Sequence, residues 1–471
     1  MATLSARALT VLLNDWRGSG SPAYLALADR IRLLIVDGRI QLGTRIPAER
    51  DLAATLQVSR TTVSAAYAEL RESGHLTSLR GSGSVARLPG RAPISIDPVT
   101  SDYLDLSKAA MPAAPGIADA AARAVADLPG YLGGTGFDPV GIPILREAIA
   151  ERYRRRGLPT DPEQVMVTIG AQHAIALLSR TLIGRGDSAL VEVPTYPHAY
   201  EALRNAGARL VPVSVSVTDG WDGDALEQAT QRSSPAVGYL MPDFHNPTGQ
   251  SMPVELRQRA LEMASRHGTR LIADETMAEL SLDSDDPVTP FAVHGDAISI
   301  GSVGKTVWGG IRVGWIRAEP ALIQKLARTR MAGDLGTPIL EQLVVANLLA
   351  DYDAILRERR TQLRAGQEYL VAALREHFPD WVVPEVAGGL TTWVNMGLPV
   401  SSQLTIAARN HGLLLAAGPR FGIDGAFERF LRIPFSHTEE ETDRAVAALS
   451  AAWHSLGRVP IAEQPYLTDV V

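Results

Sequence analysis

The chain has 471 residues, of which 46% are hydrophobic and 21% charged, and its formal net charge is -7. The composition predicts a globular protein, and the length predicts two or three domains. The absence of cysteine excludes a disulfide framework and a cysteine nucleophile, and the ten histidines lack ligand spacing, so we expect no metal site. No apolar run has the length of a membrane span, and Arg7, Asp15 and Arg17 interrupt the first twenty residues where a secretory signal needs an apolar core, so we expect a cytoplasmic protein.

The charge is divided unevenly along the chain. Residues 1–88 hold eleven Lys/Arg and seven Asp/Glu, so their net charge is +4 although the whole chain is negative. A small basic module joined to a larger acidic body is typical of a nucleic-acid-binding domain fused to a second domain. A basic face is also often no more than a solvated surface, so charge alone leaves both interpretations open.

The basic module shows three helical patterns in succession. Between residues 22 and 38 one apolar stripe at helical spacing is formed by Leu27, Ile31, Leu34 and Ile35. "IPAERDLAATL" (residues 46–56) and, after a short turn, "SRTTVSAAYAELRESG" (residues 59–74) continue the periodicity, with Ser59 as the N-cap of the last helix. The spacing predicts a helix-turn-helix.

The start of the last helix and the segment after it fit DNA contacts. Arg60, Thr61 and Thr62 lie at the position where a recognition helix meets base edges and phosphates. "LTSLRGSGSVARL" (residues 76–88) reads as a hairpin wing whose Arg80 reaches toward neighbouring phosphates. The pattern therefore predicts a winged helix-turn-helix, and the alternative is a small helical cap or dimerisation element.

The stretch "GTRIPAERDLAATLQVSRTTVSAAYAELRESGHL" resembles the GntR family of bacterial regulators, and the resemblance extends through residues 22–88. In that family the arginine of the Pro-Ala-Glu-Arg run, the first residues of the recognition helix and the wing tip contact DNA. The residues that the resemblance implies for this role are Arg50, Ser59, Arg60, Thr61, Thr62, Arg80 and Gly81. We accordingly expect a DNA-binding domain over residues 1–88 and a double-stranded DNA operator as its partner.

The rest of the chain predicts an α/β domain. Residues 89–102, with three prolines and no periodicity, are expected to form an extended linker before a domain that spans residues 103–471. There, apolar β-rich runs such as "QVMVTI", "SALVEV", "AVGYLM", "RLIAD" and "DAISIG" alternate with helical stretches. Such alternation indicates a mostly parallel sheet with helices on both faces.

Unusual residues follow these runs directly. They are Gly170-Ala171-Gln172, Pro194-Thr195-Tyr196, Asp243 to Gly249, Asp274, and Ser302 to Lys305. Ligands of such sheets bind beyond the carboxyl ends of the strands, so one site is expected from five strand ends. The turn from strand to helix at Gly170 leaves free backbone N–H groups at the start of the helix, where a phosphate would be stabilised. Ser302 and Arg312 can bind the same phosphate.

Each of these features alone also has an ordinary structural explanation. A solitary lysine such as Lys305 is usually a surface residue, Asp274 fits a helix cap, and "HNPTG" fits a turn. Their occurrence in one order along one predicted sheet edge favours a shared site.

That order resembles the fold type I aminotransferases, which use pyridoxal 5'-phosphate, over roughly residues 105 to 455. The resemblance implies that Lys305 forms a Schiff base with the cofactor aldehyde and that Arg432, in "FLRIPFS", binds a substrate carboxylate. It further implies that Asp274 pairs with the pyridine nitrogen. The other cofactor-binding residues that it implies are Gly170, Ala171, Gln172, Tyr196, Asn246, Ser302 and Arg312.

Two positions depart from the pattern of those enzymes. Thr276 stands where many of them have a tyrosine that touches the phenolic oxygen of the cofactor. Phe137, in "FDPVG", lacks the hydroxyl with which a tyrosine reaches the phosphate of the neighbouring subunit. We therefore expect cofactor binding with fewer hydrogen bonds, and turnover is less favoured than binding.

Together the two halves resemble the MocR/GabR family of transcriptional regulators. The resemblance implies a head-to-tail homodimer and a response to pyridoxal phosphate or to an amino-group effector, which Arg432 would orient while it displaces Lys305 from the cofactor. One alternative is a functional aminotransferase with an accessory DNA-binding module. Another is a regulator that senses pyridoxal phosphate alone, for which Arg432 would be dispensable.

Overall fold

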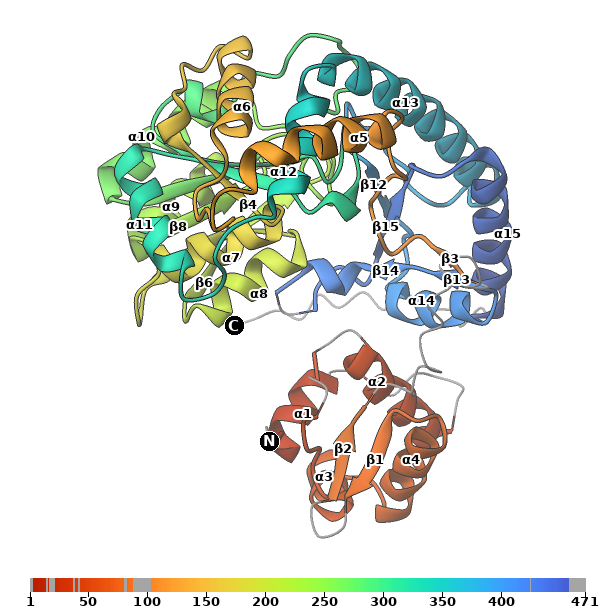
Figure 1. Ribbon diagram of the computed structural model, residues 1–471. Helices are drawn as coiled ribbons and strands as arrows, with labels where there is room; N and C mark the ends of the chain where they lie inside the picture. The colour runs from red at the N-terminus through yellow and green to blue at the C-terminus, as the bar shows by residue number, and fades with distance from the viewer. Residues whose placement is uncertain are drawn as a thin grey trace. The chain divides into compact units, whose positions relative to one another are not determined.

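The computed structural model describes residues 3–13, 16, 22–36, 39–40, 43–79, 83–87, 103–423 and 425–456 (Figure 1). The chain forms two compact units. The smaller comprises Met1–Tyr103 with Ser402–Gly412 and Ala451–Val471, and the larger comprises Leu104–Ser401 and Leu413–Ser450. The expected linker at residues 89–102 lies outside the described residues.

The described part of residues 3–87 forms helices and a hairpin. The elements are α1 (Ala6–Leu13), α2 (Ala23–Val36), α3 (Glu49–Leu56), α4 (Arg60–Glu72), β1 (Leu76–Leu79) and β2 (Gly83–Ala86). β1 and β2 pair antiparallel, which confirms the predicted wing. α1 was not predicted, because a single eight-residue run is too short for its periodicity to stand out; Leu9 and Leu13 of α1 nevertheless complete the core.

The helix that carries the DNA-contact candidates begins where the sequence predicts. The Ser59 hydroxyl accepts a hydrogen bond from the Thr62 N–H at 3.0 Å, so Ser59 is the N-cap of α4. Farther along α4, the buried Tyr67 hydroxyl donates to the carbonyl of Pro47 at 2.9 Å, which ties α4 to the segment before α3. These two hydrogen bonds set where the recognition helix starts and how it packs.

The large unit is built on an eight-stranded sheet of order β4-β11-β10-β9-β8-β5-β6-β7. The strands are β4 (Val165–Thr168), β5 (Ser188–Val193), β6 (Arg209–Ser216), β7 (Gly220–Trp221), β8 (Val237–Leu240), β9 (Arg270–Asp274), β10 (Ile298–Ser302) and β11 (Gly314–Arg317). The pairs from β10 through β9, β8 and β5 to β6 are parallel, whereas β11 and β7 pair antiparallel with their neighbours. The predicted mostly parallel sheet is confirmed.

Helices and two smaller sheets complete the described chain after residue 103 (Figure 1). The helices after residue 103 are α5 (Ile117–Asp127), α6 (Pro143–Arg155), α7 (Ala171–Leu182), α8 (Pro197–Asn205), α9 (Gly223–Ser233), α10 (Val254–His267), α11 (Pro320–Arg330), α12 (Ile339–Leu349), α13 (Tyr352–His377), α14 (Ser401–Arg409) and α15 (Glu439–Ser455). The remaining strands are β3 (Leu104–Asp105), β12 (Thr391–Asn395), β13 (Leu413–Leu414), β14 (Ala416–Ala417) and β15 (Phe430–Pro434). Short 3-10 segments are η1 (Leu128–Tyr131), η2 (Pro162–Gln164), η3 (Phe291–Val293), η4 (Gly309–Ile311) and η5 (Gly418–Phe421).

Both faces of the sheet are buried. On β5, Ala189 and Val191 belong to the core that packs against α7, α8 and α11. The alternating residue Leu190 points to the opposite face and is also buried. Strands that are apolar on both faces explain the continuous hydrophobic runs of the sequence. Among the described residues, no helix has the length and apolar character needed to cross a membrane.

Five strand ends meet at one edge of this sheet. β4 runs in the same direction as β10 because both pair antiparallel with β11. The residues after β4, β5, β8, β9 and β10 therefore emerge on the same side, as expected from the sequence.

Candidate functional site

The cradle at the start of α7 brings Gly170, Ser302 and Arg312 together. Gly170 is the N-cap of α7 with φ 78° and ψ 171°, a conformation that essentially only glycine adopts. A Cβ on it would lie 2.6 Å from Nη2 of Arg312. That guanidinium donates to the carbonyls of Ile169 at 3.1 Å and Gly309 at 3.3 Å. The first N–H groups of α7, at Ala171 and Gln172, lack a carbonyl one turn earlier in the helix, so the cradle suits an anion.

Ser302 and Arg312 are held at the cradle by the turn between β10 and β11. The Ser302 hydroxyl donates to the carbonyl of Val313 at 3.0 Å and accepts from the Gly304 N–H at 3.0 Å. Arg312 itself has a left-handed backbone, with φ 54°. Gly314 must be glycine, because a Cβ there would lie 2.9 Å from the N atom of Ala171. The turn thus packs directly against the start of α7.

Lys305 lies in the same turn and is partly exposed. Its Nζ donates to the carbonyl of Ala109 at 2.5 Å, a partner that the sequence did not indicate. Burial, together with the positive charges of Arg432 and Arg312, lowers the pKa of Lys305 to about 8, and Asp274 opposes this shift. An amine with this pKa is partly neutral near physiological pH and can act as a nucleophile.

Asp274 ends β9 and is buried. Its Oδ1 accepts from the Thr276 N–H at 3.0 Å, and its Oδ2 accepts from the hydroxyl of Tyr239 at 2.6 Å. Burial raises the pKa of Asp274, whereas the hydrogen bonds from Tyr239 and from the side chain and backbone of Thr276, together with the charge of Lys305, lower it. The carboxylate is therefore held in one orientation within a dry environment.

Asn246 follows β8 and is only 6% exposed. Its Oδ1 has no hydrogen-bond partner among the described residues. The preceding residue, His245, holds the loop: its Nδ1 lies 2.9 Å from Oγ1 of Thr248, and its Nε2 lies 3.3 Å from Oε2 of Glu192. The loop that carries Asn246 is thus held in place, and the amide oxygen of Asn246 is an unused acceptor among the described residues.

Glu192 is a buried residue of β5 that sequence reasoning missed. Its Oε1 accepts from Nε1 of Trp221 at 2.6 Å, and its Oε2 accepts from the Met241 N–H at 2.9 Å. Together with its contact to His245, these bonds join β5, β7 and the loop that carries Asn246. The signal in the sequence was an acidic residue within the apolar run "SALVEV".

Tyr196 and Arg432 complete the group. Burial and the charge of Asp274 raise the pKa of Tyr196 to about 12, while Arg312 and Arg432 lower it, so all three charges lie near the phenol. Arg432, on β15, is 6% exposed, donates to the carbonyl of Ser107, and has its Cζ 4.9 Å from the ring centre of Phe421. Its Nε has no hydrogen-bond partner among the described residues.

The two positions that depart from the expected pattern differ in their surroundings. Thr276 is buried beside Asp274 and holds it through its backbone N–H. Phe137 is 67% exposed, so its ring is not packed into the site of this chain.

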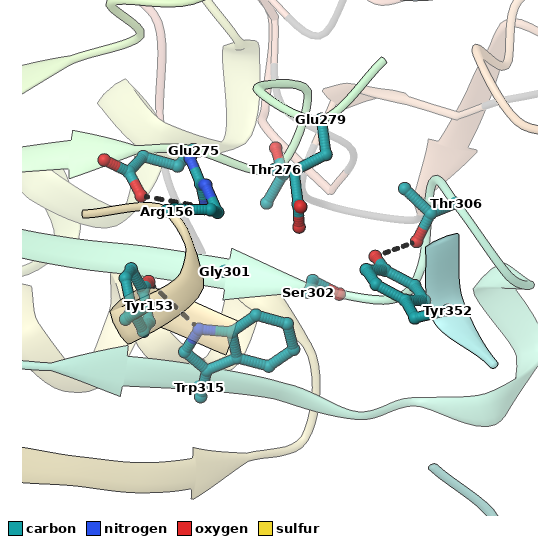
Figure 2. A pocket seen from close by; sticks show the side chains of 10 residues that line it. All are labelled: Tyr153, Arg156, Glu275, Thr276, Glu279, Gly301, Ser302, Thr306, Trp315 and Tyr352. Atoms are coloured by element: carbon teal, nitrogen blue, oxygen red, sulfur yellow. Dashed lines mark hydrogen bonds and ion pairs between the residues drawn. The ribbon is translucent and has the colours of Figure 1, made fainter. Parts of the chain in front are cut away.

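A small polar pocket adjoins the site behind Thr276 and Ser302 (Figure 2). Figure 2 shows the Arg156–Glu275 pair, with Nη1 and Oε2 3.8 Å apart, on one side of it. Burial raises the pKa of Glu275 to about 7, and Arg156 opposes that shift. The cavity, of about 10 Å³, has room for one water molecule.

The DNA-contact candidates gather at the start of α4 and on α3. Arg50, Ser59, Arg60 and Thr61 are exposed, and Thr62 is half-buried. The Ser59 hydroxyl lies 2.7 Å from the hydroxyls of both Thr61 and Thr62. Arg80 and Gly81 lie outside the described residues.

Sequence reasoning also missed an exposed arginine beside the wing. Arg45 forms an isolated β-bridge with Val85 of β2. A Cβ on Gly83 would lie 3.3 Å from its Nε, so its side chain reaches the first residue of β2, at the turn end of the hairpin. The sequence signal, a single arginine before "IPAER", was too weak to separate it from other surface cations.

Comparisons with known proteins find a matching family for each of the two halves of the chain. The family model "Aminotransferase class I and II" matches residues 101–449, and the model "Bacterial regulatory proteins, gntR family" matches residues 23–85. The chain is 31% identical to the probable rhizopine catabolism regulatory protein MocR of Rhizobium meliloti, over 78% of this chain and 80% of the relative. It is 25% identical to the uncharacterized HTH-type transcriptional regulator YdfD of Bacillus subtilis, over 89% of this chain and 94% of the relative.

A solved structure resembles the large domain. It is LysN, an alpha-aminoadipate aminotransferase from Thermus thermophilus in complex with N-(5'-phosphopyridoxyl)-L-leucine. The two proteins are 28% identical, with a TM-score of 0.68, and the match covers 75% of this chain and 93% of the other.

Proposed function

Because the chain belongs to the aminotransferase class I and II family and joins that domain to one of the gntR family, we propose that it is a DNA-binding transcriptional regulator whose large domain binds pyridoxal 5'-phosphate. Its regulator relatives support the first part, and the LysN complex supports the second. The observation that carries the proposal is the meeting of Lys305, Asp274 and the Gly170 cradle at one sheet edge.

The residues present fit this cofactor. The cradle at Gly170 places a guanidinium and free helix N–H groups where a phosphate is stabilised. Asn246 is buried with an unused amide oxygen, which suits a hydroxyl group on a ligand. Asp274 provides a buried carboxylate for a protonated ring nitrogen.

We assign each of these residues a role toward the bound cofactor. Pyridoxal 5'-phosphate supplies an aldehyde that condenses with primary amines and a protonated ring that withdraws electrons. Lys305 provides an amine whose lowered pKa keeps part of it neutral, and Asp274 holds the proton at the ring nitrogen. Tyr196 would contact the ring. Gly170, Ala171, Gln172, Ser302 and Arg312 would hold the phosphate.

The cofactor assignment has a direct test. Sodium borohydride reduces a carbon–nitrogen double bond and so fixes the cofactor on the lysine that holds it. Mass spectrometry of the digested protein should then find the added mass on the peptide that contains Lys305. A Lys305→Ala variant that still binds the cofactor covalently would overturn the assignment.

The regulatory step rests on a second ligand. We assign Arg432 to the carboxylate of an amino-group effector, because its guanidinium is buried, bonded on one side to Ser107 and unpaired at Nε among the described residues. Burial lowers the pKa of Arg432 to about 10, so it stays charged at neutral pH. The effector changes DNA binding only if it binds two states of the protein unequally.

The effector role is tested by footprinting of the DNA between the gene for this protein and the neighbouring gene. Protection should depend on pyridoxal phosphate together with an amino acid, and Arg432→Ala should abolish the response to the amino acid. A response to pyridoxal phosphate alone that survives in Arg432→Ala would support the regulator that senses only the cofactor.

The domain limits and assembly belong to the same proposal. We assign residues 1–88 to DNA binding, 89–102 to a linker and 103–471 to the effector domain, in a cytoplasmic head-to-tail homodimer. Exposed apolar side chains of the large unit support an interface with a second copy; they include Val125, Leu132, Phe137 and Met331. Light scattering of the purified protein should give twice the mass of the 50.4 kDa chain.

A functional aminotransferase is the second candidate. Lys305, Asp274 and Asn246 are all present, together with Arg312 and Arg432, and they favour it. Thr276 and Phe137 favour a regulator, since neither provides the phenol expected at its position. Steady-state transamination with a panel of amino donors separates the two, because turnover above about one per second lies in the ordinary enzyme range.

A further inference from the structure

The hydroxyl of Tyr239 is a buried polar group in the middle of an apolar strand. Tyr239 is fully buried on β8, and its hydroxyl lies 2.6 Å from Oδ2 of Asp274. Burial and the charge of Asp274 raise the pKa of Tyr239 well above its ordinary value, so the phenol keeps its proton. Tyr239 is therefore the donor and Asp274 the acceptor in this bond.

The register of the sheet explains why these side chains meet. In the parallel pair of β8 and β9, Tyr239 lies opposite Ile272. Asp274 is two residues beyond Ile272, and alternate residues of a strand share a face. Both side chains therefore lie on the face covered by α7, next to the Gly170 cradle, where Tyr239 and Ile272 belong to the same core.

The two oxygens of Asp274 have different partners. Oδ1 accepts from the backbone N–H of Thr276 at 3.0 Å, a bond that keeps its donor when the Thr276 side chain changes. Oδ2 depends on the Tyr239 hydroxyl. Rotation of the carboxylate about its Cβ–Cγ bond would break both bonds, so the pair fixes the direction in which the carboxylate points.

We propose that Tyr239 is a positioning residue that orients Asp274 and keeps it ionised toward the ring nitrogen of the cofactor. This inference rests on the proposed function, because it concerns the same site. Tyr239 acts through Asp274. The expected result of its loss is weaker cofactor binding with the fold intact.

The test is a double-mutant cycle on cofactor affinity. Pyridoxal 5'-phosphate is titrated into the full-length wild type, Tyr239→Phe, Asp274→Asn and the double variant, and binding is followed by absorbance. Tyr239→Phe keeps the ring and removes one hydroxyl, and we expect about tenfold weaker binding. In the Asp274→Asn background, where the carboxylate charge is absent, the same change should alter the affinity by less than about twofold.

A cofactor analogue and a control variant separate positioning from a structural effect. With 1-deazapyridoxal phosphate, which has carbon in place of the ring nitrogen, Tyr239→Phe should bind as tightly as wild type. Tyr67→Phe is the matched control, since its buried hydroxyl also donates a hydrogen bond, to the carbonyl of Pro47 at 2.9 Å, but lies in the smaller unit, and it should leave the affinity for pyridoxal 5'-phosphate unchanged.

The outcomes that overturn the inference differ from those that overturn the function. Equal affinity of wild type and Tyr239→Phe for pyridoxal 5'-phosphate would refute the positioning role alone. An equal loss in both Asp274 backgrounds, or with the deaza analogue, would do the same. A wild-type protein that binds no pyridoxal 5'-phosphate would overturn the proposed function and this inference with it.

Discussion

Replacement of Gly170 by alanine is the sharpest test of the phosphate cradle. The added Cβ would lie 2.6 Å from Nη2 and 3.1 Å from Cζ of Arg312, closer than side-chain atoms approach. The guanidinium must therefore move, and its bonds to the carbonyls of Ile169 and Gly309 are lost. Gly170→Ala thus removes Arg312 from the place where the phosphate is expected.

The structure allows the size of both effects to be worked out. The backbone of Gly170, at φ 78° and ψ 171°, costs a non-glycine residue about 1–3 kcal/mol, so the free energy of unfolding should fall by roughly 2 kcal/mol. A hydrogen bond to a charged group contributes about 1.5–3 kcal/mol, so the loss of Arg312 should weaken cofactor binding by about 10- to 100-fold.

Gly157→Ala is the matched control. Gly157 also has a positive φ, of 85°, but a Cβ on it would meet nothing within 4 Å. It should lose about 1 kcal/mol of stability through backbone strain and bind pyridoxal 5'-phosphate as wild type does. Urea denaturation gives the stability of each variant, and absorbance titration gives its affinity.

The two variants together test whether the cradle binds the phosphate of the cofactor. Gly170→Ala that binds the cofactor as tightly as wild type would refute the assignment of the cradle. If Gly157→Ala loses affinity for the cofactor by the same factor, the loss in both variants follows from reduced stability and not from disruption of the cradle.

Three further outcomes are expected. The rate at which pyridoxal 5'-phosphate attaches to Lys305 should rise with pH and level off above about pH 8, because the neutral amine is the nucleophile and its pKa is about 8; a rise that continues past pH 10 would contradict this value. Ser59→Ala should lower the unfolding free energy of the small domain by about 1 kcal/mol, since the N-cap bond of α4 is lost, and no change in chemical denaturation would dismiss that role. Arg60→Ala should weaken operator binding and reduce its salt dependence by about one phosphate contact. Arg123→Ala, an equal charge change at an exposed position of α5, should do neither in an electrophoretic mobility shift assay.

Sequence patterns predicted the framework of the large domain because buried parallel strands are apolar on both sides. Each of the runs that contain Met166, Val191, Tyr239, Ile272 and Ile300 is a strand in the structure. Strand β6 was missed because its alternating burial produces no continuous apolar run. Strand β11 was missed because it is short and follows the glycine-rich turn.

The polar network behind the site was beyond the reach of sequence patterns. Tyr239 and Asp274 are 35 residues apart, and Trp221 and Glu192 are 29 residues apart. A buried hydroxyl or indole finds its acceptor according to the order and register of the strands. The spacing of residues along the sequence reveals neither the order nor the register. Residues that directly follow strands, such as Lys305 and Asn246, were easier to identify because strand ends share one edge.

The contacts of Lys305 and Arg432 have a consequence for folding. Lys305 is bonded to Ala109 across 196 residues of chain, and Arg432 is bonded to Ser107 across 325 residues. Contacts between such distant segments form only when the intervening chain is present and its loop-closure entropy has been overcome. A nascent chain has the whole DNA-binding domain long before it can close this site, and cofactor binding therefore distinguishes a finished protein from a truncated one.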